Sequence, residues 1–210
     1  MQFKHIAIAG NIGAGKTTLC ELLSQRFGWQ VNYESTEDNP YLADFYEDMQ
    51  RWSFNLQVYF LNNRFRQILE IQKGELTVIQ DRSIYEDAHI FAPNLYQMGL
   101  MTERDFRNYF DLFQLMTAHI QPPDLLIYLR ADIATLVKHI QTRGREYEAN
   151  MSINYLSKLN ERYENWIKGY KEGRLLILDV AHLDYKNNLN DVNFVLQEVQ
   201  KKLEIPSLYL

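Results

Sequence analysis

The sequence predicts an α/β fold in which helices flank a parallel five-stranded sheet. Apolar, strand-like runs recur at residues 3–9, 30–33, 76–80, 124–129 and 174–178, and helix-length segments separate them. Parallel strands need long crossovers, so this alternation favours a parallel sheet with helices on both faces. A glycine-rich loop follows the first run, and polar side chains follow the second and third. Ligands bind beyond the carboxyl ends of such strands, and we therefore expect the functional residues to gather at that edge.

The glycine-rich loop has the sequence Gly10-Asn11-Ile12-Gly13-Ala14-Gly15-Lys16-Thr17-Thr18. It matches the phosphate-binding loop (P-loop) pattern G-x-x-x-x-G-K-[ST] between an apolar strand and the start of a helix. Backbone N–H groups and the helix N-terminus can surround phosphate oxygens there. In this pattern Lys16 reaches the β- and γ-phosphates, and the Thr17 hydroxyl binds magnesium. A chance glycine-rich turn is the alternative. The loop predicts a nucleoside triphosphate and leaves the acceptor open.

The composition bounds the class of protein. The 210 residues, 46% of them hydrophobic, suffice for one core, and we expect a single domain over residues 1–210. The net charge of −5 argues against nucleic acid as the main partner. The single cysteine, Cys20, excludes an internal disulfide. We find no secretory signal and no apolar run near 18 residues, which predicts a cytoplasmic protein without a membrane partner.

Glu34 falls where the second strand should end, beside the phosphate loop. A carboxylate at that place can accept the proton of an attacking hydroxyl as a general base. Glu37 and Asp38 follow closely, so an acid that caps a helix or is simply solvated is the alternative.

Asp81 and Arg82 follow the third strand. A carboxylate at that strand end lies near the metal of a P-loop enzyme, and the arginine beside it can meet the incoming phosphate. The alternative is an acid that caps the following helix.

The segment 51–73 contains neither glycine nor proline and is predicted to be one helix. Gln57 and Arg64 are seven residues apart, so they lie on nearly the same face. An amide can pair with a nucleobase edge, and a buried guanidinium requires a carboxylate, for which Asp87 is the best candidate. Phe91, four residues after Asp87, can stack on a base. Each of these side chains could instead be solvated, but their shared register favours a site.

Arg143 and Arg145 flank a glycine after the helix that follows the fourth strand. Two arginines in this setting fit a mobile lid over about residues 143–150, which closes over the triphosphate and stabilises charge on the transferring group. A basic surface turn is the alternative.

Two long helical segments carry more apolar residues than one face can hold: 51–73, and a second that starts at Thr102 and ends near Pro122. One face of each must cover the sheet. The surplus fits either burial against a second copy, as in a homodimer, or a deeper core within one chain.

Together these residues resemble the deoxynucleoside kinase family, and in particular its bacterial deoxyadenosine/deoxyguanosine kinase branch. The resemblance covers most of the chain, in matching order and spacing. Its motifs are the phosphate loop at 10–17, Glu34 with residues 37–42, Phe45-Tyr46, residues 52–57, Arg64, residues 81–87 and residues 143–145.

The resemblance implies that the γ-phosphoryl group of ATP, with Mg²⁺, is transferred to the 5′-hydroxyl of a deoxynucleoside. It implies that Glu34 is the general base and that Gln57 pairs with the base edge. It further implies that Arg64 and Asp87 recognise the base as a coupled pair, and that Phe91 stacks on it.

Further roles follow from the same resemblance. Tyr46 and Glu148 match residues that hold the 3′-hydroxyl, which favours deoxyribose. Asp81 and Arg82 match the acid and the arginine around magnesium and the 5′ position.

The match is looser after the last strand, where Asp184 and Tyr185 resemble a loop that contacts the adenine of ATP. Two positions depart from the family pattern. Ser35 follows Glu34 where animal members carry proline, and His139 lies where some members have a further lid arginine. The lid prediction therefore rests on Arg143 and Arg145 alone.

Two other functions remain open. A monophosphate kinase of thymidylate-kinase type shares the phosphate loop and the Asp-Arg motif, but it needs arginines for the acceptor's phosphate and has no use for Glu34. A catalytically idle binding subunit is possible too, although Lys16, Thr17 and Arg143 are intact. Arg64 with Asp87 can serve adenine, guanine or cytosine, and the bacterial-branch motifs favour deoxyadenosine. Feedback inhibition by a deoxynucleoside triphosphate is expected of the family, but no single residue indicates it.

Overall fold

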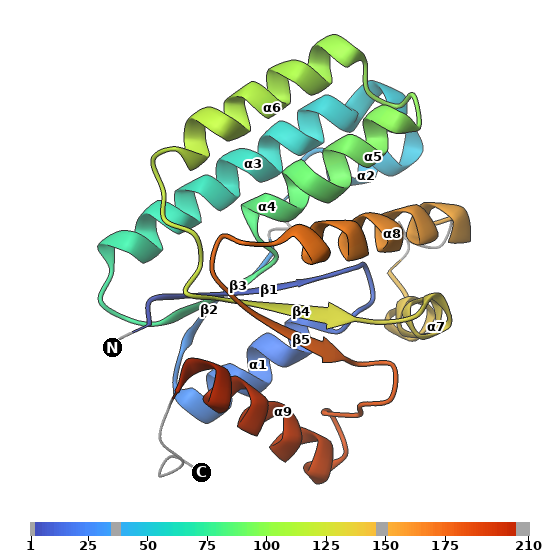
Figure 1. The fold of residues 1–210 in the computed structure, drawn as a ribbon. Coiled ribbons are helices and arrows are strands. Elements are labelled where there is room, and N and C mark those ends of the chain that lie inside the picture. Colours follow the sequence, from blue (N-terminus) through green and yellow to red (C-terminus); the bar gives the residue numbers. More distant parts are fainter. Residues whose placement is uncertain (1–2, 35–38, 146–150, 205–210) are drawn as a thin grey trace.

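Five parallel strands form the central sheet of the computed structural model, which describes residues 3–34, 39–145 and 151–204 (Figure 1). The strand order is β2-β3-β1-β4-β5, and every neighbouring pair is parallel. The parallel five-stranded sheet predicted from the apolar runs is therefore confirmed. The strands are β1 His5–Gly10, β2 Gln30–Asn32, β3 Val78–Asp81, β4 Leu125–Arg130 and β5 Arg174–Asp179.

Helices form the crossovers between the strands. They are α1 Lys16–Phe27, α2 Leu42–Glu47, α3 Met49–Lys73, α4 Ile84–Glu86, the π-helical turn η1 Asp87–Phe91, α5 Ala92–Gln97, α6 Glu103–Thr117, α7 Ile133–Arg143, α8 Ile153–Gly169 and α9 Leu189–Leu203. The helix predicted over 51–73 is α3, which starts slightly earlier because the Asp48 carboxylate accepts a hydrogen bond from the Arg51 N–H and caps the first turn. No helix within the described ranges is long and apolar enough to cross a membrane.

Different helices cover the two faces of the sheet (Figure 1). On β1, Ile6 and Ile8 belong to the core shared with α1 and α9, whereas Ala7 and Ala9 face α8. Successive side chains of a strand point to opposite faces, and all four of these are fully buried. β1 is therefore covered on both sides, which explains its unbroken apolar sequence.

Helices α3 and α6 form a further layer beyond the sheet, on the side of α8 (Figure 1). Leu61 and Ile68 of α3 pack with Tyr109 and Phe113 of α6 in a separate apolar cluster. This layer holds α3 over the sheet, and α3 carries the buried polar residues Gln57 and Arg64.

The strand order brings three sequence motifs to one edge. β3 lies between β1 and β2 and runs parallel to both. The phosphate loop after β1, Glu34 after β2 and Asp81 at the end of β3 therefore lie at the same edge of the sheet, as the sequence predicted.

Candidate active site

The phosphate loop has the backbone shape that its glycines allow. Gly13 and Gly15 have φ angles of 84° and 91°, which a residue with a side chain rarely adopts. The Lys16 ammonium donates hydrogen bonds to the carbonyl oxygens of Gly10 (3.0 Å) and Asn11 (3.2 Å). Burial first, and then the charge of Arg82, lower the pKa of Lys16 to about 8. The loop thus holds a buried cation beside N–H groups that can bind phosphate.

Thr17 and Asp81 meet across the edge of the sheet. The Thr17 hydroxyl donates a hydrogen bond to Oδ2 of Asp81 at 2.6 Å. Asp81 is buried, and its Oδ1 has no hydrogen-bond partner among the described residues. Magnesium is bound in such sites by one or two carboxylates together with substrate phosphates. The hydroxyl and the carboxylate fit that ion, and the described part of the chain holds no larger cluster of ligating side chains.

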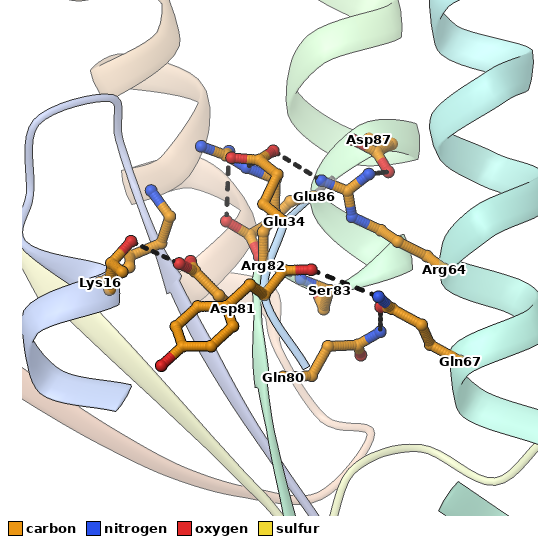
Figure 2. Close-up of polar contacts among 12 residues, drawn as sticks. Lys16, Glu34, Arg64, Gln67, Gln80, Asp81, Arg82, Ser83, Glu86 and Asp87 are labelled. Carbon is orange, nitrogen blue, oxygen red and sulfur yellow. Dashed lines mark hydrogen bonds and ion pairs between the residues drawn. The ribbon is translucent and has the colours of Figure 1, made fainter. Parts of the chain in front are cut away.

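Glu34 lies between two arginines from different elements (Figure 2). Its Oε1 is 2.8 Å from Nη2 of Arg64 on α3 and 2.8 Å from Nε of Arg82 after β3. Burial alone would raise the pKa of Glu34, but the charges of Arg82 and Arg64, followed by Lys16, hold it at about 2. The carboxylate is therefore ionised throughout the neutral range and fixed in place.

Arg64 is also paired with Asp87, as predicted. Its Nη1 lies 3.0 Å from Asp87 Oδ2, and the two side chains are only 4% and 2% exposed. Burial raises the pKa of Asp87, and the charges of Arg64 and Arg82 oppose that rise. Asp87 opens the single π-helical turn η1, and Phe91 closes it. Such turns occur often at functional sites. The Phe91 ring lies 4.5 Å from the guanidinium carbon of Arg82.

Gln57 and Tyr46 lie in the same layer as Arg64. Gln57 is 3% exposed, and its Oε1 has no hydrogen-bond partner among the described residues. Buried amide oxygens are seldom left without a partner, so this one suits a ligand. Tyr46 lies on α2, half-buried and edge-on to Phe45 at 5.2 Å. Glu148, the predicted partner of Tyr46, lies outside the described residues.

The two lid arginines lie at the end of α7. Arg143 is the last residue of that helix, and Gly144 caps it with a φ of 68°. Arg143 is exposed and Arg145 is half-buried. The remainder of the predicted lid, residues 146–150, is outside the described ranges, so lid motion remains a prediction.

Tyr185 and Asp184 lie between β5 and α9. The Tyr185 ring is buried, and its hydroxyl donates a hydrogen bond to the Gly15 carbonyl at 3.2 Å. Asp184 accepts hydrogen bonds from Asn187 in its own turn. The tyrosine hydroxyl thus reaches the backbone of the phosphate loop, and the predicted contact of these residues with adenine is untested.

Comparison with known proteins identifies the family of this chain. The family described as "Deoxynucleoside kinase" matches residues 6–204. The chain belongs to the deoxynucleoside kinase family. It is 39% identical over 196 residues to a deoxyadenosine/deoxycytidine kinase of Bacillus subtilis, covering 92% of this chain and 90% of that one. It is 33% identical over 200 residues to a deoxyguanosine kinase of the same species, covering 93% and 96%.

A solved structure of the family has the same fold. Deoxyadenosine kinase from M. mycoides, with dCMP and a flexible dCDP bound, superposes with a TM-score of 0.83 and 29% sequence identity, covering 94% of this chain and 99% of that one. The α/β fold of a deoxynucleoside kinase is therefore shown here over nearly the whole chain.

Two supporting residues of the kinase site were missed in the sequence. Glu86 is fully buried, and its carboxylate accepts hydrogen bonds from the N–H groups of Gly10 (3.2 Å) and Ser83 (2.7 Å). The Tyr163 hydroxyl accepts one from Arg82 Nη1 at 2.9 Å and lies 2.8 Å from Glu86 Oε1. The spacing Ser83-x-x-Glu86 is a capping-box signal, so Glu86 could have been found as a cap. No local pattern indicates Tyr163, which comes from α8.

Arg82 has an unusual backbone. Its φ is 73°, in the left-handed region that non-glycine residues seldom occupy. Such strain persists only where the surroundings hold it, and it tends to occur at functional sites. Glu34, Glu86 and Tyr163 surround the buried guanidinium of Arg82, and these contacts keep the residue in its strained conformation.

A chain of amides also supports the end of β2 (Figure 2). Gln67 on α3 donates to the Tyr33 carbonyl at 3.3 Å and accepts from Nε2 of Gln80 at 2.9 Å. Oε1 of Gln80 is 3.0 Å from Nε2 of His5. Burial lowers the pKa of His5 to about 4, so the ring is neutral and donates through Nε2. α3 therefore holds both the backbone before Glu34 and the Glu34 side chain.

Proposed function

We propose that this kinase transfers the γ-phosphoryl group of ATP to the 5′-hydroxyl of a deoxynucleoside, with deoxyadenosine as the preferred substrate. One observation carries the proposal. The Glu34 carboxylate lies between Arg64, which is paired with Asp87, and Arg82, at the same edge of the sheet as the phosphate loop. An alcohol at that carboxylate would face the terminal phosphate of a nucleotide held by the loop.

The chain's own cations stabilise the transferring group in this proposal. The transition state of phosphoryl transfer is loose, so positioning and charge stabilisation supply most of the catalysis. Lys16 neutralises the phosphates from the loop, Arg82 meets the incoming group, and Arg143 and Arg145 approach from α7. Thr17 and Asp81 would hold Mg²⁺, which neutralises charge on the β- and γ-phosphates when bound.

Glu34 accepts the proton late in this mechanism. A carboxyl group with a pKa of about 2 is too weak a base to ionise an alcohol in advance. In a loose transition state the attacking hydroxyl becomes acidic only as the new P–O bond forms. A fixed, ionised carboxylate suits that order, because it orients the hydroxyl first and takes the proton afterwards.

Gln57, Arg64 and Asp87 read the base edge in this proposal. All three are buried, and the Gln57 oxygen, which has no hydrogen-bond partner in the described part of the chain, can accept a hydrogen bond from the exocyclic amine of adenine. The relatives act on adenine, cytosine or guanine nucleosides according to their names, and we favour deoxyadenosine because such kinases occur among both the sequence and the structural matches. Phe91 stacks on the base, and Tyr46 with Glu148 holds the 3′-hydroxyl.

One assay tests the reaction and its acceptor. ATP and Mg²⁺ are incubated with each of the four deoxynucleosides and with thymidine monophosphate, using Lys16→Ala as the background control for contaminating kinases. We expect the highest kcat/KM with deoxyadenosine. Preference for thymidine monophosphate would instead indicate a monophosphate kinase. If phosphate is transferred to none of the acceptors, the protein is an idle binding subunit. A preference for deoxyguanosine or deoxycytidine would mean that the preferred base is guanine or cytosine instead of adenine.

We propose further that two copies associate through α3 and α6. Besides the residues buried between them, these helices carry half-buried Val58, Phe65 and Phe110, and Leu115 of α6 is 63% exposed. Light scattering should give twice the 25.0-kDa mass of one chain for the wild type, and the mass of a single chain for Leu115→Glu. Leu189→Glu is the matched control, because Leu189 is 77% exposed on α9 and lies outside the proposed interface. A monomeric wild type would refute this interface.

The cytoplasmic location also remains a proposal. Its support is that the one cysteine, Cys20, is a buried, unpaired thiol on α1, as in proteins of reducing compartments.

A further inference from the structure

His139 lies on α7, and its side chain contacts the phosphate loop. Nδ1 of His139 lies 2.8 Å from the carbonyl oxygen of Gly13. A carbonyl oxygen only accepts, so Nδ1 carries the proton and donates. Both the neutral ring protonated at Nδ1 and the doubly protonated ring can make this bond. The contact therefore requires a side chain of this shape with an N–H donor at this position, and it does not require a charge.

Helix α7 approaches the loop closely enough that only glycine fits. A Cβ atom on Gly13 would lie 2.7 Å from the Leu136 carbonyl oxygen and 2.9 Å from Cγ1 of Ile140, both of which belong to α7. Gly13 also has a φ of 84°. The loop backbone thus packs directly on α7, and the His139 hydrogen bond adds a polar interaction to that contact.

The same helix carries the first lid arginine. Arg143 comes four residues after His139, so the two lie on the same face of α7. The hydrogen bond from His139 therefore ties to the loop the same face of α7 that carries Arg143. Other contacts to the loop backbone come from elsewhere: Tyr185 lies between β5 and α9, and Tyr163 is on α8. Among these polar contacts, that of His139 joins the loop to the helix that bears Arg143.

We propose that His139 is a positioning residue that couples the phosphate loop to the arginine-bearing end of α7. A triphosphate that orders the loop also fixes α7, including Arg143 at its end. The inference rests on the proposed ATP site and adds to it a residue that acts through the backbone of the loop.

Two substitutions of nearly equal shape isolate the hydrogen bond. Nδ2 of asparagine occupies the place of histidine Nδ1, whereas leucine has the same branched shape as asparagine without a donor. His139 is exposed, so neither change should prevent folding, and thermal unfolding checks this. ATP affinity is measured by calorimetric titration with Mg²⁺ and no nucleoside. We expect H139L to weaken ATP binding about 3- to 10-fold, the scale of one hydrogen bond, and H139N to stay within about twofold of wild type.

A second measurement reports the coupling itself. Trypsin cleavage after Arg143 should slow in the wild type and in H139N when ATP is saturating. H139L should stay sensitive at its own saturating ATP concentration. The nucleoside KM should be the same in all three proteins.

Equal ATP affinity and equal protection in H139N and H139L would overturn the coupling and leave the proposed kinase reaction intact. An H139N variant that binds ATP weakly and is not protected from trypsin would also overturn the coupling, because the imidazole would then act by contacting ATP. A protein that transfers phosphate to no nucleoside yet still distinguishes H139N from H139L in ATP binding would refute the proposed reaction and keep the coupling. If H139L fails to fold, H139A takes its place against H139N.

Discussion

Oε1 of Glu34 accepts a hydrogen bond from Nη2 of Arg64 at 2.8 Å, and this contact joins the proposed base-recognition pair to the proposed general base. Nη1 of the same guanidinium lies 3.0 Å from Asp87. A nucleobase that draws Arg64 toward itself therefore weakens the hold on Glu34. The pKa of Glu34 should rise as that positive charge moves away.

We expect Glu34→Gln to lower kcat by about 10²-fold or more, the scale of general-base catalysis. Glutamine keeps the shape of the side chain and can still accept hydrogen bonds, but its amide cannot take the proton. The nucleoside KM should change little, and steady-state kinetics with ATP measures both constants. A variant with near-normal turnover would remove Glu34 from the mechanism.

We expect Asp87→Ala to weaken the use of purine deoxynucleosides by about 2–5 kcal/mol, because Arg64 loses its buried partner. The measure is kcat/KM for each of the four deoxynucleosides. Glu161→Ala is the matched control, since Glu161 is an exposed acid on α8, outside the proposed interface, and its loss changes the net charge equally. Unchanged relative rates across the four substrates in Asp87→Ala would argue against base recognition by this pair.

We expect ATP affinity to fall as the pH rises above about 8. The lowered pKa of Lys16, about 8, means that the free protein loses the ammonium charge above that pH. Bound phosphates favour the charged form, so binding must then take up a proton, at a loss approaching tenfold in affinity per pH unit.

The measurement is a titration with ATP from about pH 6.5 to about pH 9.5, spanning the Lys16 transition. Lys16→Arg is the control, because a guanidinium stays charged over this range and its affinity should not show that fall. A wild-type affinity that is constant up to about pH 9 would contradict the assignment.

We expect Gly13→Ala to destabilise the fold more than Gly28→Ala. Both glycines have positive φ angles, 84° and 69°, so both substitutions introduce backbone strain of about 1 kcal/mol or more. Only at Gly13 does the added Cβ meet another group, the Leu136 carbonyl at 2.7 Å; nothing lies within 4 Å at Gly28. Urea unfolding of the two variants gives the difference, which measures the contact between the loop and α7. Equal destabilisation would mean that α7 moves away freely.

Much of the fold and the centre of the candidate site could be predicted because their signals are local. The five apolar runs are the five strands, and the uninterrupted segment 51–73 is α3. The seven-residue spacing of Gln57 and Arg64 placed them on one face, and the pairing of Arg64 with Asp87 followed from the need of a buried guanidinium for a carboxylate. Helical periodicity can be read from the sequence, and the requirement of a buried guanidinium for a carboxylate is a general rule that needs no coordinates.

Other features depend on contacts between distant segments. Tyr163 reaches Arg82 and Glu86 from α8, and the Gln67-Gln80-His5 chain crosses from α3 through β3 to β1. Glu34, Glu86 and Tyr163 surround the guanidinium of Arg82 and so hold its left-handed backbone. No local sequence pattern indicates contacts of this kind, because their partners are far apart in the sequence.

The sequence by itself determined the phosphate-loop motif, the five strands with the long helix 51–73, and the residues that meet at the edge of the sheet, because each depends on local pattern or on strand topology. Only the tertiary structure decided that Glu34 is ionised with a pKa of about 2, that Arg64 holds two carboxylates at once, and that His139 reaches the Gly13 carbonyl. Those properties come from charges and donors brought within 3.0 Å by packing, and the strength of such interactions depends on distance and burial.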